Sequence, residues 1–279
     1  MRWLFKRAKA MSWGLLVLGA LILAAFAVSI TIEGRQFLPL FGVKPLSFTW
    51  VMAIFVVWYM VSSVITGRYE RTLLRKIEAL LTETCDPQSC VAEYEKILPK
   101  STRDMKTYLL MELGSAYLAA GDAEKAWEYL EQVTSFPQRG GRSASYRFVH
   151  QSYMLSYSVL TDDLESGGDW LNKMRGILDD SVGIGESVKA TLNDHYNTQS
   201  HVFNIANGEF EGAETVFLED FNTGTKKLSK VAAQSRLGKV YLHFDRRDEA
   251  KAALEYVIAN GNKTRYVEEA KELLGLINQ

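Results

Sequence analysis

The chain has 279 residues, of which 47% are hydrophobic and 23% are charged, and its formal net charge at pH 7 is -1. This composition excludes a disordered or fibrous chain, and the near-zero charge gives no indication of nucleic-acid binding. The only two cysteines, Cys85 and Cys90, exclude a disulfide-stabilised scaffold and suit a reducing compartment.

Two uncharged runs near the N-terminus predict a transmembrane hairpin over residues 1–66. The runs cover residues 12–32 and 48–65. As helices they would be roughly 30 Å and roughly 27 Å long, close to the hydrocarbon thickness of a bilayer. A cleaved signal peptide is the alternative for the first run, because the Ala-Phe-Ala sequence at 25–27 resembles a processing site. The length of the first run and the presence of a second one favour membrane spans.

Basic residues at the ends of the two runs predict the orientation of the hairpin. Four basic residues precede the first run and four follow the second, whereas the connector 33–47 contains only two. Because positive charge is enriched on the cytoplasmic side, both termini are expected in the cytoplasm, with the protein integral to a cell or inner membrane. Anionic lipid headgroups are the expected contacts of the four residues after the second run. These residues are Arg68, Arg71, Arg75 and Lys76.

Residues 67–279 follow a 3.6-residue hydrophobic period, which predicts an all-α domain made of helix pairs. The clearest unit covers 107–138. Its first helix carries Leu113-Gly114 and Tyr117, a turn follows at Gly121-Asp122, and the second helix carries Ala126 and Leu130. The small residues at 114 and 126 allow the two helices to approach closely, and the larger ones fill the space between them.

A second unit, at 231–262, repeats this pattern with Leu237-Gly238, Tyr241, Ala250 and Leu254. Residues 264–277 are expected to form a helix that caps the array. Less regular pairs are expected between and before the two units. These pairs are 143–161 with 168–178, 187–206 with 209–220, and 69–82 with 90–98.

The two clear units resemble the tetratricopeptide (TPR) repeat, in which Leu-Gly and Tyr precede a turn and Ala follows it. This resemblance implies an α-solenoid of stacked helix pairs that binds other proteins. A membrane hairpin followed by such repeats is also similar in architecture to HemY-like bacterial inner-membrane proteins, an analogy that concerns the order of elements alone.

The sequence contains no recognisable catalytic, cofactor or metal site. His195 and His201 are six residues apart, so on a helix they diverge and do not form a metal-binding pair. Cys85 and Cys90 lack the Cys-x-x-Cys spacing of redox enzymes and are interpreted as reduced thiols. We therefore expect a protein that is not an enzyme and that needs no cofactor.

Two sets of polar residues are candidates for a partner-binding groove. The first shares one face of the helix at 187–206, where amides could bind an extended peptide; its alternative is a solvent-exposed stripe. This set is Asn193, Asn197, His201 and Asn204. The second is Arg236 with Lys239, which could bind an acidic partner or simply form a basic surface. Tyr146, Tyr153 and Tyr157, with His150, form an aromatic stripe that is more typical of core packing than of a ligand site.

These patterns favour a membrane-anchored TPR adaptor or scaffold that recruits protein partners at the cytoplasmic face. One alternative is a structural or assembly subunit of a membrane complex that acts through its hairpin. The other is an enzyme with a cryptic site that acts on envelope precursors. The sequence does not identify the partner.

Overall fold

The computed structural model describes residues 17, 19, 48–136, 141–180 and 184–277. The chain divides into two compact units, Met1–Lys76 and Ile77–Gln279. Within the described ranges the secondary structure consists of eleven α-helices and one 3₁₀ helix, without a strand. The prediction of an all-α fold is confirmed for this part of the chain.

Helix α2 (Phe48–Thr82) joins the second apolar run to the predicted helix at 69–82 without a break. None of the helices that the structure describes is long and apolar enough to cross a membrane. Apart from residues 17 and 19, the first apolar run lies outside the described residues. The prediction of two membrane spans with both ends in the cytoplasm is therefore contradicted by the described helices.

The supposed flanking charges belong to the same helix as the second apolar run. Arg68, Arg71, Arg75 and Lys76 are exposed on α2, and Arg71 Nε donates to the carbonyl of Gly67 at 3.0 Å. The sequence argument treated the run as a helix that ends where the charges begin. The lipid-headgroup contacts predicted for these four residues depended on the membrane spans and lose that basis.

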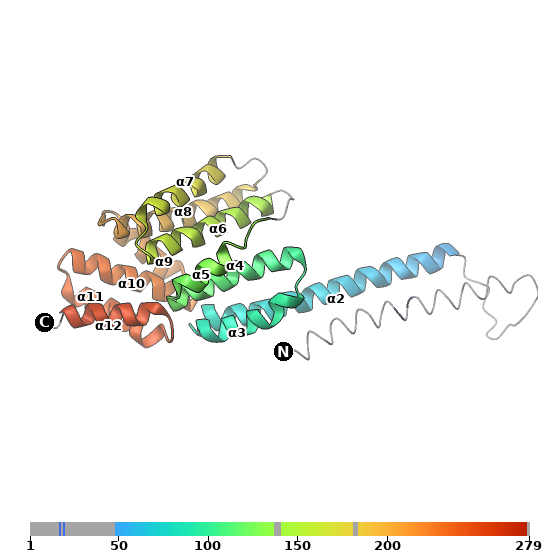
Figure 1. Ribbon diagram of the computed structural model, residues 1–279, viewed down its shortest axis with the longest axis horizontal. Coiled ribbons are helices and arrows are strands. Elements are labelled where there is room, and N and C mark those ends of the chain that lie inside the picture. The colour runs from blue at the N-terminus through green and yellow to red at the C-terminus, as the bar shows by residue number, and fades with distance from the viewer. Residues whose placement is uncertain (1–16, 18, 20–47, 137–140, 181–183, 278–279) are drawn as a thin grey trace, which may run out of the picture. The chain divides into compact units, whose positions relative to one another are not determined.

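After α2, the unit Ile77–Gln279 is a succession of antiparallel helix pairs (Figure 1). Its elements are α3 (Pro87–Ile97), η1 (Leu98–Lys100), α4 (Arg103–Ala120), α5 (Ala123–Leu130), α6 (Gly141–Leu160), α7 (Leu164–Asp179), α8 (Glu186–Ala206), α9 (Ala213–Thr223), α10 (Lys227–His243), α11 (Arg247–Asn260) and α12 (Arg265–Ile277). Helix α4 packs on α5, α6 on α7, α8 on α9 and α10 on α11, an arrangement consistent with a helical solenoid.

Four of the turns between helices share one feature of backbone conformation. A residue with left-handed φ stands immediately before the N-cap of the second helix in each of them. The four residues are Cys85 (φ 53°), Gly121 (φ 84°), Asp162 (φ 59°) and Asp245 (φ 55°). A residue with left-handed φ ends a helix and allows the chain to reverse direction, so the same backbone conformation forms the turn in each of these four hairpins.

Aspartate N-caps fix the start of the second helix in three of these turns. Asp86 accepts a hydrogen bond from the backbone N–H of Ser89 at 3.1 Å. Asp122 caps α5 through Lys125 in the same way at 3.1 Å. The cap of α7 is Asp163, which accepts from Ser166 at 3.2 Å. Each cap satisfies a backbone donor that the first helical turn leaves unpaired, typically worth about 1 kcal/mol.

Close approach of the two helices within a pair depends on a glycine. A Cβ at Gly114 would lie 2.5 Å from Leu130 Cδ2, and one at Gly238 would lie 2.6 Å from Leu254 Cδ2. Leu130 and Leu254 are fully buried. The predicted roles of Gly114 and Leu130 in packing are thus found in α4 and α5, and the same contact recurs in α10 and α11.

The last helix connects the end of the array with its beginning. Helix α12 packs on α10 and α11 and also contacts α4. The loop before α12 binds the turn before α3, because Asn262 Nδ2 donates to the Thr84 carbonyl at 2.9 Å. Lys263 adds an ion pair with Asp86 at 2.8 Å. Cys85 completes the junction by packing in a core cluster with side chains of α10, α11 and α12.

Candidate functional site

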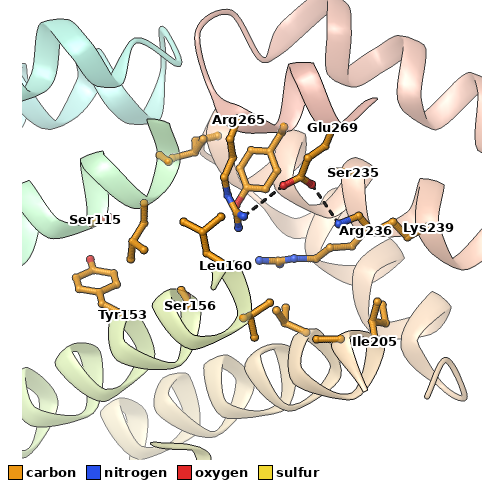
Figure 2. Close-up of a pocket in the computed structure, with 17 residues that line it drawn as sticks. Ser115, Tyr153, Ser156, Leu160, Ile205, Ser235, Arg236, Lys239, Arg265 and Glu269 are labelled. Carbon is orange, nitrogen blue, oxygen red and sulfur yellow. Dashed lines mark hydrogen bonds and ion pairs between the residues drawn. The ribbon is translucent and has the colours of Figure 1, made fainter. Parts of the chain in front are cut away.

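The first helices of the pairs, together with α12, surround a cavity of about 320 Å³ (Figure 2). Helices α4, α6, α8, α10 and α12 all contribute to its lining. This volume lies at the lower end of the range for small-molecule and peptide side-chain pockets in proteins. Closure of the array by α12 is what turns the inner face of the repeats into a bounded site.

The cavity has apolar walls with a few hydroxyl groups. The apolar lining side chains come from α4, α6, α8 and α10, and they include Leu118, Val159, Leu160, Val202, Ile205 and Leu228. Five residues with hydroxyl groups also line the site, namely Ser115, Tyr153, Ser156, Ser235 and Tyr266. Such a mixture suits a ligand that is largely apolar and makes a small number of directed hydrogen bonds.

The repeat packing places two of the lining residues. Ser115 directly follows Gly114, and Lys239 directly follows Gly238. Because both glycines face the second helix of their pair, the next residue of each helix is turned toward the inner side of the array. The same position therefore carries a hydroxyl in α4 and a cation in α10.

A single carboxylate in the lining is shared by two cations. Glu269 Oε2 lies 3.1 Å from Lys239 Nζ, and Glu269 Oε1 lies 3.3 Å from Arg265 Nη1. Figure 2 shows both contacts as dashed lines. These distances exceed the 2.7–2.9 Å that is typical of charge-assisted hydrogen bonds. The Nε atom of Arg265 is buried and has no hydrogen-bond partner within the described part of the chain.

Arg236 is the third cation of the lining and has no ion-pair partner among the described residues. Its guanidinium carbon lies 5.4 Å from the centre of the Phe217 ring, within cation–π range. Figure 2 shows the guanidinium pointing into the cavity in the direction of Leu160. Burial raises the pKa of Asp220, and the charge of Arg236 opposes this effect, so the two groups are close enough to interact electrostatically.

Of the six residues predicted to form a partner-binding groove, two line this cavity. They are Arg236 and Lys239. The four on α8 lie elsewhere. Asn193 and Asn197 are exposed, and Asn204 is half-buried outside the cavity. His201 packs against the turn before α9, where a Cβ at Gly212 would lie 3.3 Å from its Cε1. The polar stripe and the cavity are thus on different faces of α8.

The residues of the aromatic stripe on α6 pack against neighbouring side chains, and one of them also lines the cavity. Tyr146 and Tyr153 pack against a core cluster on α4, and Tyr157 lies 5.1 Å from Trp127, measured between ring centres. His150 is buried, its Nε2 lies 3.1 Å from the Leu130 carbonyl, and burial lowers its pKa. Only Tyr153 also lines the cavity.

Arg265 and Glu269 are site residues that the sequence analysis missed. They are four residues apart in a helix that we interpreted as a cap with a solvated surface. Opposite charges at this spacing are typical of exposed helix faces. No local signal distinguishes them, because their place in the site depends on the packing of α12 against α10 and α4.

A second carboxylate missed by the sequence analysis is Glu112 on α4. Burial raises its pKa to about 7, the negative charge of Glu78 adds to this effect, and Lys226 opposes it. Lys226 and Glu78 form an ion pair at 2.5 Å. Glu112 does not line the cavity, and its neighbour Tyr153 connects the two regions.

The cysteines are structural. Both are free and buried, and burial raises the pKa of each, that of Cys90 to about 12. A thiol with such a pKa is a poor nucleophile at neutral pH. Within the described ranges there is also no group of three or more His, Cys, Asp or Glu side chains that could hold a metal ion.

The cavity combines apolar walls with the cationic side chains of Arg236, Lys239 and Arg265. Three cations face a single lining carboxylate, and among the described residues one of their donors, Arg265 Nε, is buried without an acceptor. Searches with this chain match no protein-family model, no curated protein and no solved structure. The geometry of the site is therefore the basis for proposing a function.

Proposed function

We propose that this chain is a protein-interaction module of the TPR type, and that the cavity enclosed by α4, α6, α8, α10 and α12 receives a segment of a protein partner. The observation that carries the proposal is that one site is built from the first helices of four pairs, α4, α6, α8 and α10, together with the capping helix α12. Helical repeat arrays bind partners through the surface that their first helices share.

The recurring hairpin design supports the TPR comparison. Gly114 with Leu130 and Gly238 with Leu254 make the same close contact in two separate pairs. The left-handed residue before the second helix recurs in four turns. The chain repeats these packing devices, while the side chains that face the cavity differ from pair to pair. Such a division is typical of a scaffold whose inner face is adapted to a particular partner.

Site-specific photocrosslinking in the full chain tests the proposal. A photoreactive amino acid at Ser156, which lines the cavity, should capture a partner in cells that express the protein. The same amino acid at Lys251, which is exposed on α11, serves as the matched control. A product that forms from position 156 and not from position 251 supports the proposal. Identical product patterns at both positions would contradict it.

A further inference from the structure

We propose that Glu269 is an internal stand-in for a carboxylate of the partner, and that the cavity binds an acidic side chain flanked by apolar ones, in competition with Glu269. This inference rests on the proposed function and deepens it, because it names the chemistry of the segment that is bound.

The first argument is an excess of cationic donors. Arg236, Lys239 and Arg265 line the cavity, and Glu269 is the single carboxylate in the lining. Asp220 lies near Arg236, but its oxygens accept from the Thr198 hydroxyl at 3.2 and 3.1 Å and form no ion pair with Arg236 among the described residues. Partly desolvated cations without a carboxylate partner gain most from an incoming anion.

The second argument is the loose geometry of Glu269. One carboxylate serves two cations through one oxygen each, at 3.1 Å and 3.3 Å. Its contact with Arg265 uses Nη1, and Nε finds no partner among the residues that the structure describes. A guanidinium binds a carboxylate best through two parallel hydrogen bonds. A ligand carboxylate that engages Nε as well as Nη would therefore satisfy Arg265 better than Glu269 does.

The third argument concerns what surrounds the charges. The walls on α6 and α8 include Val159, Val202 and Ile205. They present no charged side chain that a ligand would have to pair with. A segment with an acidic residue between two aliphatic residues fits both parts of the site. Ser115 and Ser235 also line the site and add polar groups to it.

Nuclear magnetic resonance titration of the full chain with defined peptides tests the inference. The probes are an end-capped peptide with glutamate between two leucines, the matched peptide with glutamine, and an uncapped leucine peptide that carries only a terminal carboxylate. The arginine Nε–H signals report binding, and this method detects even millimolar affinity. We expect saturable shifts of Arg236 and Arg265 with the glutamate peptide and not with the glutamine peptide.

Two variants that each remove a charge should change the affinity for the glutamate peptide in opposite directions. Glu269→Gln removes the competing charge and should tighten binding of the glutamate peptide by several fold, whereas Arg236→Gln should weaken it by about tenfold. Glu255→Gln, in an exposed i,i+4 pair with Lys251 at 4.0 Å, is the control and should change nothing. The comparison of glutamate and glutamine peptides on the unaltered chain remains decisive even if a variant folds poorly.

Three results would overturn the inference: equal shifts with both capped peptides, no saturable shift with any probe, or weaker binding to a folded Glu269→Gln variant. Binding of only the uncapped leucine peptide would also overturn it, because the site would then select a chain end. If crosslinking from Ser156 still captures a partner in these cases, the proposed function stands and only the acidic chemistry is wrong.

Discussion

The hairpins α4/α5 and α10/α11 share their packing and differ in their chemistry. Gly114 with Leu130 and Gly238 with Leu254 are equivalent contacts, with hypothetical Cβ distances of 2.5 and 2.6 Å. Two positions before the glycine, however, α4 carries Glu112 and α10 carries Arg236. The first is a carboxylate whose pKa burial raises to about 7, and the second is a cation in the cavity. One scaffold thus supports two opposite electrostatic environments.

The largest predicted effect tests the shared packing. Leu130→Ala and Leu254→Ala each remove a fully buried side chain from between the two helices of a pair. Each should lower the free energy of unfolding by about 2–5 kcal/mol, because lost burial and a cavity add together. Urea denaturation measures both. If the two substitutions lower the free energy of unfolding by very different amounts, the two contacts are not equivalent.

The next effect concerns the glycines. Gly114→Ala and Gly238→Ala force a Cβ against the neighbouring leucine and should each cost about 1–3 kcal/mol. Gly176→Ala on α7, where a Cβ meets nothing within 4 Å, is the control and should stabilise the protein by about 0.5–1 kcal/mol. In a Leu130→Ala background, the cost of Gly114→Ala should largely disappear. A cost that persists there would show that the contact is not its cause.

The electrostatic difference between the hairpins predicts a pH dependence. Folding raises the pKa of Glu112 from the ordinary value of 4.5 to about 7, so the folded state binds more protons between these values. This group therefore lowers stability as pH rises from about 4.5 to 7. Glu112→Gln should raise the free energy of unfolding by about 1–3 kcal/mol at pH 8 and have little effect at pH 4. Urea denaturation at both pH values, with Arg236→Gln as the comparison, checks this.

An equal effect of Glu112→Gln at pH 4 and pH 8 would contradict the raised pKa. The Arg236→Gln variant should show the opposite sign, because Arg236 favours the ionised form of Asp220 and its loss should cost more at pH 8 than at pH 4.

The smallest predicted effect lies in the turns. Gly121 and Asp245 occupy equivalent positions with φ of 84° and 55°. Gly121→Ala should cost about 1 kcal/mol, because a residue with a Cβ is disfavoured in the left-handed region. Asp245→Gly should stabilise by about 0.5 kcal/mol for the same reason. Thermal unfolding of the two variants and the unaltered chain shows whether each substitution stabilises or destabilises the protein. If both variants are destabilised by the same amount, the φ angle does not determine the effect.

The periodic sequence was sufficient to predict most helices and the packing within pairs. Residues 114, 130, 238 and 254 follow local rules, since the spacing of apolar and small residues determines which side of a helix is buried. Helix α7 begins at Leu164, four residues before the predicted start at 168, because Asp163 caps it through Ser166. Arg236 and Lys239 were identifiable as a pair on one helix.

The remaining features depend on contacts between distant residues. Closure of the array rests on the bonds of Asn262 and Lys263 with the turn at 84–86, which no local pattern indicates. Arg265 and Glu269 enter the site only through that closure. The two predicted membrane spans are contradicted as well, since no helix that the structure describes is long and apolar enough to cross a membrane.

The most direct test of the central claim asks whether the cationic side chains of the cavity are needed for partner binding. Crosslinking from Ser156 is measured in the full chain and in the same chain with Arg236→Gln and Lys239→Gln. We predict that the partner product is lost in the double variant while its helical content, measured by circular dichroism, is unchanged. A product of undiminished yield from the folded double variant would contradict the claim that these cations bind the partner.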